Sequence, residues 1–138
     1  MTRLVESMND LIEVRFISPK KGKGVFAKEE IKKGAIIDVA HVIPLSNKDY
    51  KKISKTVLYN YCYIWEDPRH NPEFMNAISL SVSQFINHSY SPNVRYLYNY
   101  EENCIEFEAL RDIEKSEEVL VNYNGLVDDK SPVWFDIK

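Results

Sequence analysis

Three short segments of the sequence combine residue types that can hold a ligand. The first is Gly22-Lys23-Gly24, the second runs from Asn87 to Asn93 as Asn-His-Ser-Tyr-Ser-Pro-Asn, and the third runs from Glu117 to Tyr123. Glycine has no Cβ, so a ligand can approach its backbone closely. The second segment is a polar loop between apolar stretches, and its hydrogen-bonding groups must find partners somewhere. A loop fixed inside the protein against a polar ligand would meet that need.

Each segment also has a purely structural interpretation. Isolated glycines usually serve backbone geometry, and Asn and Ser side chains often close turns. Gly22 to Gly24 is not a dinucleotide fingerprint, because no third glycine follows and no helix is expected there. A tyrosine that ends an apolar strand, as Tyr123 does, usually caps the core. By default the other aromatic residues of the central region are also core residues, namely Tyr59, Tyr61, Tyr63, Trp65 and Tyr96.

Composition removes several classes of function. The chain has 138 residues, the length of one domain. It carries 18 Lys and Arg against 21 Asp and Glu, and this net charge of −3 argues against general nucleic-acid binding and suits a neutral or basic partner. No apolar run approaches the roughly 20 residues of a membrane span, and the first ten residues lack the apolar region of a secretory signal. We therefore expect an intracellular protein, with the cytoplasm as the simplest compartment.

A metal site is not expected. Two cysteines, Cys62 and Cys104, are too few for a disulfide framework or a four-cysteine zinc site. The three histidines, His41, His70 and His88, lack the close pair spacing of metal ligands. A metal-dependent hydrolase therefore has no ligand set in this sequence.

The elements that must position the three segments are mostly short strands. Ser46, with Asp49 three residues later, is a good N-cap and predicts one short helix over Asn47 to Ser54. The turns Lys20 to Gly24 and Ile31 to Gly34 separate extended pieces. Period-two patterns and β-branched residues predict strands at Glu13–Ile17, Val25–Ala27, Ala35–Pro44, Val57–Trp65, Ala77–Val82, Val94–Tyr98, Cys104–Leu110 and Glu118–Asn122. This pattern indicates a mainly β domain.

Taken together, the order and spacing of the three segments resemble the SET domain of protein-lysine methyltransferases. The resemblance covers roughly Glu13 to Gly125, and the Asn-His-Ser motif at Asn87 is its most specific part. It implies several short sheets, with a knot-like C-terminal segment that threads beneath the loop of that motif, an exception to the usual topology rules. It also divides the chain into an N-terminal extension at 1–12, a SET domain at 13–125 and an aromatic tail at 126–138 that completes the active site.

The resemblance implies S-adenosylmethionine as the methyl donor and a lysine in a protein, such as a histone, as the acceptor. The residues implied to bind the donor are Gly22, Lys23, Gly24, Asn87, His88, Tyr123 and Trp134. Tyr123 is also implied to be catalytic, beside the transferring methyl group. The position two residues earlier, which often tunes the number of methyl groups added, is Val121. Tyr96 resembles an alternative position for that role and is the second residue implied to be catalytic.

Several departures from the family pattern bear on these expectations. Ser116 and Asn122 replace a usual Gly and Asp, and neither change removes a reacting group. The tyrosine that many members carry after the first strands is missing from Ala40-His41-Val42, which leaves one wall of the lysine channel unassigned. No zinc-binding module follows Gly125, and Trp134 either packs over the donor or is an ordinary hydrophobic staple. A second function stays open, a degenerate SET domain that binds basic peptides without turnover.

Overall fold

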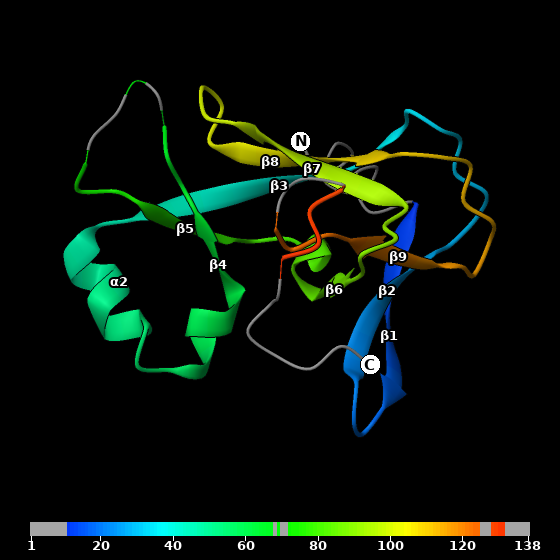
Figure 1. The fold of residues 1–138 in the computed structure, drawn as a ribbon, viewed down its shortest axis with the longest axis horizontal. Helices are drawn as coiled ribbons and strands as arrows, with labels where there is room; N and C mark the ends of the chain where they lie inside the picture. The colour runs from blue at the N-terminus through cyan, green and yellow to red at the C-terminus, as the bar shows by residue number, and fades with distance from the viewer. Residues whose placement is uncertain (1–10, 68, 70–71, 125–127, 132–138) are drawn as a thin grey trace, which may run out of the picture.

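The protein is built from two small curved sheets that meet around one apolar core (Figure 1). We describe it from a computed structural model, which defines residues 11–67, 69, 72–124 and 128–131. The first sheet has the strand order β1-β2-β9-β6, formed by β1 (Ile12–Ser18), β2 (Gly22–Ala27), β9 (Glu118–Val121) and β6 (Asn87–His88). The second has the order β4-β5-β3-β8-β7, formed by β4 (Cys62–Ile64), β5 (Asn76–Ser79), β3 (Ile36–Leu45), β8 (Cys104–Ala109) and β7 (Val94–Asn99).

The hairpin of β1 and β2 forms because a turn at residues 19–21 reverses the chain. Gly22 follows this turn with φ of +71°, a left-handed conformation that favours glycine. The sequence predicted Gly22 and Gly24 inside the turn, whereas both lie in β2, with Arg15 opposite Gly24. Their place in a strand matters because β2 pairs with β9. In that pairing Phe26 lies opposite Glu118.

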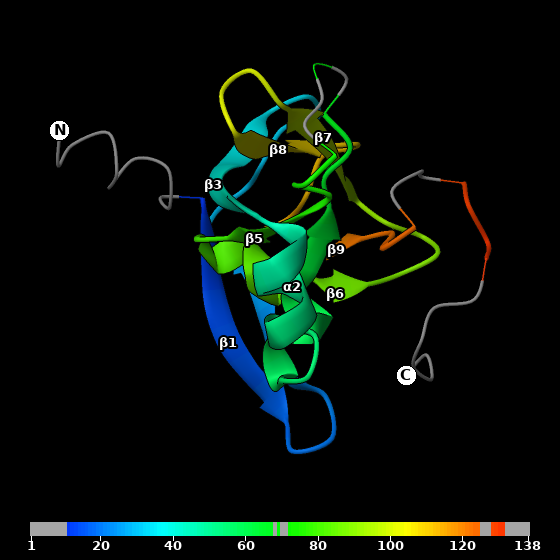
Figure 2. The same ribbon diagram turned by 90° about the vertical axis from the view of Figure 1, so that its left-hand side faces the viewer.

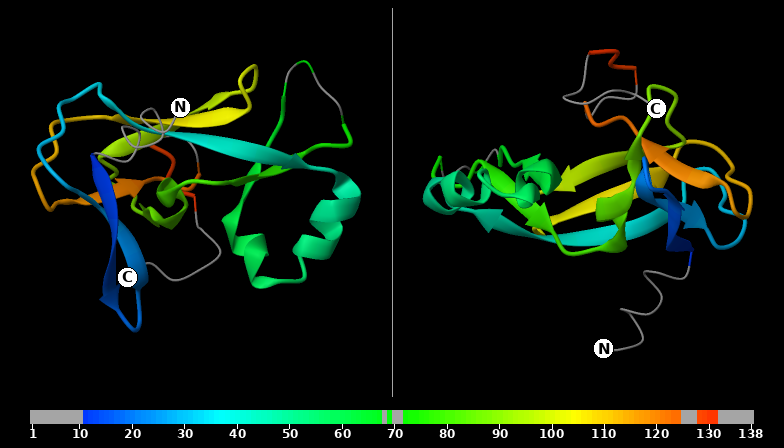
Figure 3. Two further views of the ribbon diagram at one scale, coloured as in Figure 1. Left: turned by 180° about the vertical axis from the view of Figure 1, so that it is seen from behind. Right: turned by 90° about the horizontal axis from the view of Figure 1, so that it is seen from below.

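The predicted short helix is confirmed as α2 (Asn47–Ile53). Ser46 is its N-cap, and the Ser46 hydroxyl accepts a 3.1 Å hydrogen bond from the backbone N–H of Asp49. Helix α2 stands at one end of the molecule and the β1–β2 hairpin at the other, as Figures 1 and 3 show, and Figure 2 views the molecule with α2 in front. The expectation of a mainly β domain with one short α-helix is therefore correct for the described residues.

The strand predicted for Val57 to Trp65 is wrong in its first half. Residues Val57–Tyr61 form a 3-10 helix, η1, and only Cys62–Ile64 are extended as β4. The Thr56 hydroxyl caps η1 by accepting a 3.2 Å bond from the N–H of Leu58, which favours a tight helical turn over extension. As a result the aromatic residues of this stretch do not share one face. Trp65 is 2% exposed in the core, whereas Tyr59 is 50% exposed.

Other strand boundaries shifted by a few residues. The strand predicted for Ala77 to Val82 ends at Ser79, and a second 3-10 helix, η2 (Val82–Phe85), follows it. The hairpin of β7 and β8 is confirmed, with Asn103 at φ of +51° in its turn. The last strand ends at Val121, one residue earlier than predicted.

The core draws on both sheets, and its most deeply buried residues include Val25, Ile31, Phe107, Ile113 and Val119. Burial of such side chains is the main favourable term in folding, about 25 cal/mol per Å² of apolar surface. The core thereby fixes the two sheets relative to each other and holds β9 between β2 and β6. Among the described residues, the helices are all too short to span a membrane.

Candidate active site

The C-terminal strand β9 lies against the polar loop that the sequence singled out. β6, the two-residue strand at the start of this loop, pairs with β9 in parallel, a pairing the sequence did not predict. Farther along, the N–H of Ser89 donates to the Val121 carbonyl at 2.8 Å. Asn93 is 1% exposed, and its side chain donates to the Glu118 carbonyl and accepts from the Leu120 N–H, both at 2.8 Å. These bonds hold the C-terminal segment beneath the loop.

Asn87 joins three segments that are far apart in the sequence. Its side-chain nitrogen donates to the Lys23 carbonyl at 3.1 Å and to Glu118 Oε2 at 2.9 Å. Both bonds use the amide nitrogen, so the amide oxygen Oδ1 is left as an acceptor for something else. Gly24 makes this arrangement possible, because a Cβ there would lie 2.8 Å from Glu118 Oε2 and 3.0 Å from Asn87 Nδ2. The glycine is therefore required by the close approach of these side chains.

His88 positions the backbone of Tyr123. Its Nδ1 accepts a 3.0 Å hydrogen bond from the Tyr123 N–H, so the ring must be neutral at this nitrogen. Burial lowers the pKa of His88, which favours the same neutral form. The ring also packs edge-on against Tyr90, with centroids 4.5 Å apart. His88 is thus a well-packed orienting residue.

The hydroxyl of Tyr123 points back to the loop and donates to the Ile86 carbonyl at 2.6 Å. Burial raises the pKa of Tyr123 to about 12, with smaller effects from the neighbouring Tyr61, Tyr96 and Glu118. The phenol therefore stays neutral at physiological pH. A neutral hydroxyl and a carbonyl lie side by side here, and both oxygens can accept weak CH···O contacts from a methyl group.

A cavity of about 600 Å³ opens beside Tyr123 and is lined mainly by tyrosines. They come from η1, β4 and β7 as well as the C-terminal segment, and include Tyr61, Tyr63, Tyr96, Tyr98, Tyr100 and Tyr123. Tyr63 and Tyr96 meet edge-to-face with centroids 5.8 Å apart, and the Tyr96 hydroxyl donates to the Tyr123 carbonyl at 3.3 Å. Burial raises the pKa of Tyr63, Tyr96 and Tyr98. The tyrosines of the cavity are thus neutral, one carboxylate, Glu66, also lines it, and this combination suits an alkyl chain that ends in a cation.

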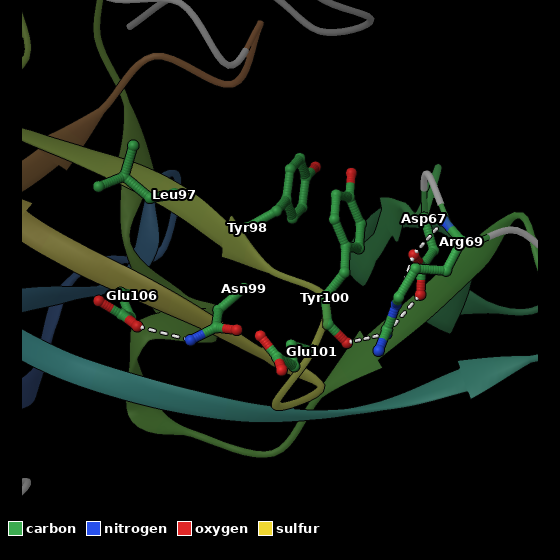
Figure 4. A pocket seen from close by; sticks show the side chains of 8 residues that line it. All are labelled: Asp67, Arg69, Leu97, Tyr98, Asn99, Tyr100, Glu101 and Glu106. Atoms are coloured by element: carbon green, nitrogen blue, oxygen red, sulfur yellow. Dashed lines mark hydrogen bonds and ion pairs between the residues drawn. The ribbon is translucent and has the colours of Figure 1, made fainter.

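A second hollow, of about 540 Å³, adjoins the first through Tyr98 and Tyr100 (Figure 4). Those two rings stack with centroids 5.4 Å apart. Arg69 lies across the hollow, where it binds the Asp67 carboxylate and the Tyr100 carbonyl. Two further acids, Glu101 and Glu106, also line it, so three carboxylates outnumber the one guanidinium. The region around the aromatic cavity is therefore acidic on this side.

Glu117, the residue before β9, has a structural role. Its carboxylate accepts hydrogen bonds from Arg111 and from the Glu114 N–H, the latter at 3.0 Å. The bond from Arg111 is the main cause that lowers the pKa of Glu117 to about 2. The neighbouring Glu118 instead contacts Asn87. The two adjacent glutamates therefore differ in role. Glu117 holds the loop of Arg111 and Glu114, whereas Glu118 holds the side chain of Asn87, a candidate ligand-binding residue.

The structure brings most of the sequence-derived candidates together. Asn87 lies against Gly24 and bonds to Glu118, the adjacent His88 bonds to Tyr123, and Tyr96 lies in the cavity wall. The Lys23 carbonyl belongs to this group, whereas its ammonium lies 5.4 Å from the centre of the Phe85 ring. Trp134 lies outside the described residues. Within the described ranges, no group of three His, Cys, Asp or Glu side chains is arranged to hold a metal.

Sequence reasoning missed several walls of the cavity. It assigned Tyr61 and Tyr63 to the core by default and gave Tyr98 and Tyr100 no role. These residues supply walls of a channel for which the sequence offered no tyrosine at Ala40 to Val42. The available signal was the density of tyrosine, since Tyr96 and Tyr98 alternate along β7 and Tyr100 follows in the next turn.

Comparison with known proteins identifies relatives of this chain. The SET domain family matches residues 22–124. The chain is 29% identical over 118 residues to a histone-lysine N-methyltransferase of Schizosaccharomyces pombe named as specific for H3 lysine-37, which covers 85% of this chain and 72% of that protein. It is 34% identical over 120 residues to the variant-silencing SET domain-containing protein of Plasmodium falciparum, which covers 76% of this chain but 4% of that protein.

Solved structures share the fold. A crystal structure of a candidate histone methyltransferase of Plasmodium falciparum aligns with a TM-score of 0.61 and 25% identity, and covers 83% of this chain and 93% of that one. The Polycomb Repressive Complex 2 of Chaetomium thermophilum, bound to S-adenosylmethionine, aligns with a TM-score of 0.62 and 21% identity over 83% of this chain and 15% of that one. The second likeness concerns the fold alone.

Proposed function

The chain belongs to the SET domain family, and we propose that it transfers methyl groups from S-adenosylmethionine to the side-chain amine of a lysine in an intracellular protein. The observation that carries the proposal is the position of Tyr123. On one side it contacts His88 of the polar loop, and on the other it lines the tyrosine cavity. Two ligands that meet at Tyr123 from opposite sides would be held in line for a displacement at carbon.

The residues on the polar side fit the amino-acid part of the donor. Asn87 offers Oδ1 as an acceptor for an ammonium group, because its nitrogen is already used by Lys23 and Glu118. The missing Cβ of Gly24 leaves room for the Asn87 side chain, which can therefore lie against β2 with Oδ1 available. We propose that the backbone of residues 22–24, together with Asn87 and His88, holds the donor. When bound, the donor supplies an electrophilic methyl carbon on a sulfonium sulfur.

The cavity fits the lysine. A lysine side chain has a pKa of about 10.4, so its deprotonation at pH 7 costs roughly 4–5 kcal/mol. Burial in an aromatic cavity lowers that cost because it disfavours the charged form. The tyrosine faces first attract the ammonium by cation–π contacts. The hydroxyl of Tyr123 and the carbonyl of Ile86 then lie where they can align a methyl group.

The substrate is proposed to be basic around the target lysine, with histones as the first candidates. Two curated relatives carry histone-lysine methyltransferase names, and the one from Schizosaccharomyces pombe is named for H3 lysine-37. The acidic hollow of Asp67, Glu101 and Glu106 adjoins the cavity and would favour basic flanking residues. The chain spans only 40% and 4% of two of the curated relatives, so further domains and partners of those proteins are not carried over.

The C-terminal tail is proposed to cover the donor. The described residues 128–131 lie against the polar loop, since the Tyr90 hydroxyl donates to the Ser131 carbonyl at 2.7 Å and the Lys130 ammonium donates to the Tyr90 carbonyl at 2.8 Å. Tyr90 in turn packs on His88. If Trp134 covers the donor, removal of residues 132–138 will weaken donor binding. If that residue is only a hydrophobic staple, the melting temperature will fall while donor affinity holds.

The decisive experiment combines binding and transfer. Calorimetry with S-adenosylmethionine measures donor binding, and labelled methyl transfer onto histone H3 and onto cell lysate measures turnover. We expect both to be positive, with label on lysine. Donor binding without transfer to any protein would favour a peptide-binding SET domain, and absence of both would contradict the proposal. EDTA is expected to leave the activity unchanged.

A further inference from the structure

A buried carboxylate near the tyrosine cavity has no part in the function proposed so far. Asp38 of β3 is 2% exposed and is the only carboxylate among the buried polar side chains of the described chain. Its Oδ2 accepts a 2.5 Å hydrogen bond from the Ser81 hydroxyl. Its Oδ1 has no hydrogen-bond partner among the described residues. A buried ionised carboxylate held by one neutral hydroxyl is costly, because it has lost water without gaining a counter-charge.

Asp38 is linked to a segment that forms part of the cavity wall. Its partner Ser81 is two residues before Ser83, and both Ser83 and Gln84 line the cavity. Tyr63 also lines the cavity, and the Asp38 charge is one of the causes that raise its pKa, although burial is the main cause. The carboxylate is thus connected to the space proposed for the lysine through its hydrogen bond to Ser81, which is two residues before the lining residue Ser83.

Buried oxygens without partners gather in this part of the molecule. Within the described chain they are Asp38 Oδ1, Ser79 Oγ, Ser83 Oγ and Gln84 Oε1. The orientation of the Gln84 amide is fixed, because its nitrogen donates to the Tyr61 carbonyl at 2.5 Å, so the free oxygen is an acceptor. Buried polar atoms of native proteins usually have a protein or water partner. A group of acceptors calls for a ligand that brings N–H or O–H bonds.

No cation of the described chain compensates Asp38. The titratable or charged side chains on the strands around it are Cys62 and Tyr63 of β4, Arg95, Tyr96 and Tyr98 of β7, Cys104, Glu106 and Glu108 of β8, and His41 of β3 itself. The one cation among them, Arg95, is paired with Glu108. The two glutamates flank Phe107, the β8 residue that pairs with Asp38, so they point to the other face of the sheet and bind β7 side chains. His41 is exposed. On the side of the cavity lie neutral tyrosine phenols and one further carboxylate, Glu66, and no cation is among the described lining residues.

We propose that Asp38 receives the proton that the substrate lysine must lose, through one water molecule held by Ser83 and Gln84. This rests on the proposed function, because it gives a role to the wall of the same cavity. An N–H bond of the lysine ammonium breaks and its electron pair stays on nitrogen. The water takes that proton and passes one of its own to Asp38 Oδ1, where an O–H bond forms. The acid returns the proton to solvent after the product leaves.

The arrangement has two physical advantages. At pH 7 only about one lysine in 2,500 is a free amine, so a site that accepts the ammonium uses nearly all of the substrate. An uncompensated negative charge behind neutral phenols favours entry of that ammonium form. Asp38 does not line the cavity, so it is a positioning residue that acts through the water and the two side chains that hold it.

The test is the pH dependence of transfer in Asp38→Asn, a nearly isosteric change. With an H3 peptide as substrate, we expect kcat/KM of the variant to be about 10²-fold below that of the unmodified protein at pH 7. The deficit should shrink severalfold per pH unit as the pH rises toward the lysine pKa, because free amine then arrives from solution. Glu29→Gln, an exposed carboxylate, is the charge-matched control and should show no deficit. A deficit independent of pH, or no deficit, would overturn the proposal.

Two measurements that need no turnover complete the test. Removal of an uncompensated buried charge should leave the melting temperature unchanged or raise it. A peptide with norleucine in place of the target lysine should bind the unmodified protein at least about tenfold more weakly than the lysine peptide, and Asp38→Asn should erase most of that preference. A large fall in melting temperature, or an unchanged preference, would make Asp38 a structural residue. Failure of the unmodified protein to transfer methyl groups would instead contradict the proposed function.

Discussion

The two sides of Tyr123 differ in how their polar atoms are satisfied. On the side of the polar loop, protein partners hold the polar groups. Asn87 binds Lys23 and Glu118, and His88 binds the Tyr123 backbone. On the side of the cavity, buried oxygens of Ser83 and Gln84 have no partner among the described residues. The protein pre-organises the polar side and leaves Asn87 Oδ1 as an acceptor there, whereas the cavity has buried acceptors that no described residue binds.

This difference indicates how the two sides bind. A pre-organised group loses little freedom when a ligand arrives, so its affinity depends on exact placement of side chains. An aromatic cavity with free acceptors selects by chemistry, because a ligand without N–H bonds would leave those acceptors unpaired. Substitutions on the polar side should therefore act through geometry. Substitutions in the cavity should act through the charge and number of N–H bonds of the acceptor.

The largest effect is expected where the two sides meet. Tyr123→Phe removes the hydroxyl that donates to the Ile86 carbonyl at 2.6 Å. Loss of alignment should lower kcat by at least about 10²-fold, while the stability falls by about 1 kcal/mol for the lost bond. Kinetics and circular dichroism measure the two effects. The matched change is Tyr100→Phe, where the cavity adjoins the second hollow, and it should lower kcat much less. Equal losses of kcat in the two variants would show that the Tyr123 hydroxyl does not align the methyl group.

Gly24→Ala tests the pre-organised side. The new Cβ would lie 2.7 Å from Ile17 Cδ1 and within 3.0 Å of Asn87 Nδ2, so these side chains must move. We expect donor affinity to fall about tenfold or more, with a stability loss of about 1–3 kcal/mol from overpacking. Gly34→Ala is the control, since its φ of +86° strains an alanine but no atom lies within 4 Å of the new Cβ. Calorimetry that finds equal donor affinity in both variants would contradict the geometric role.

Glu117→Gln tests the structural part of the same side through pH. The folded-state pKa of Glu117 is lowered to about 2 from its ordinary value of 4.5, mainly by the bond from Arg111. Its stabilisation is therefore fully present above about pH 4.5 and is lost as the pH falls toward 2, because the unfolded state takes up the proton first. The variant should melt lower at pH 7, and the gap should close under acid. Melting curves of the variant and the unmodified protein at several pH values measure this gap, and a gap that stays constant down to pH 2 would contradict the prediction.

The smallest effect is expected in the cavity wall. Tyr96→Phe removes a hydroxyl that donates to the Tyr123 carbonyl at 3.3 Å and borders the cavity. The variant has more room in the cavity and one polar contact fewer. A methylated lysine amine should therefore rotate more easily into the orientation needed for the next methyl transfer. The products should shift severalfold toward di- and trimethyl-lysine at nearly unchanged first transfer. Mass spectrometry of the peptide measures this, and an unchanged product ratio at equal turnover would remove Tyr96 from the site.

Local signals in the sequence were sufficient for much of the fold. The Ser46 cap predicted α2, the alternating pattern predicted the β7–β8 hairpin, and the order of three motifs identified the family. The error at Val57 to Tyr61 has a local cause. An alternating aromatic pattern looks extended, but the Thr56 cap closes a 3-10 turn there. The spacing of apolar residues does not tell whether a capping hydrogen bond or a strand pairing will be the more favourable.

The sequence by itself determined the polar side of the site, because Asn87, His88 and Tyr123 stand in compact motifs whose hydrogen-bonding groups demand partners. It could not determine which partners, since Gly24 and Glu118 are 63 and 31 residues from Asn87. The cavity was decided by tertiary structure alone. Its tyrosines come from separate elements, and a tyrosine in a core and a tyrosine in a cavity wall look the same in sequence. Asp38 belongs with the cavity, because only the packing of β3 against the segment of Ser81 buries its charge.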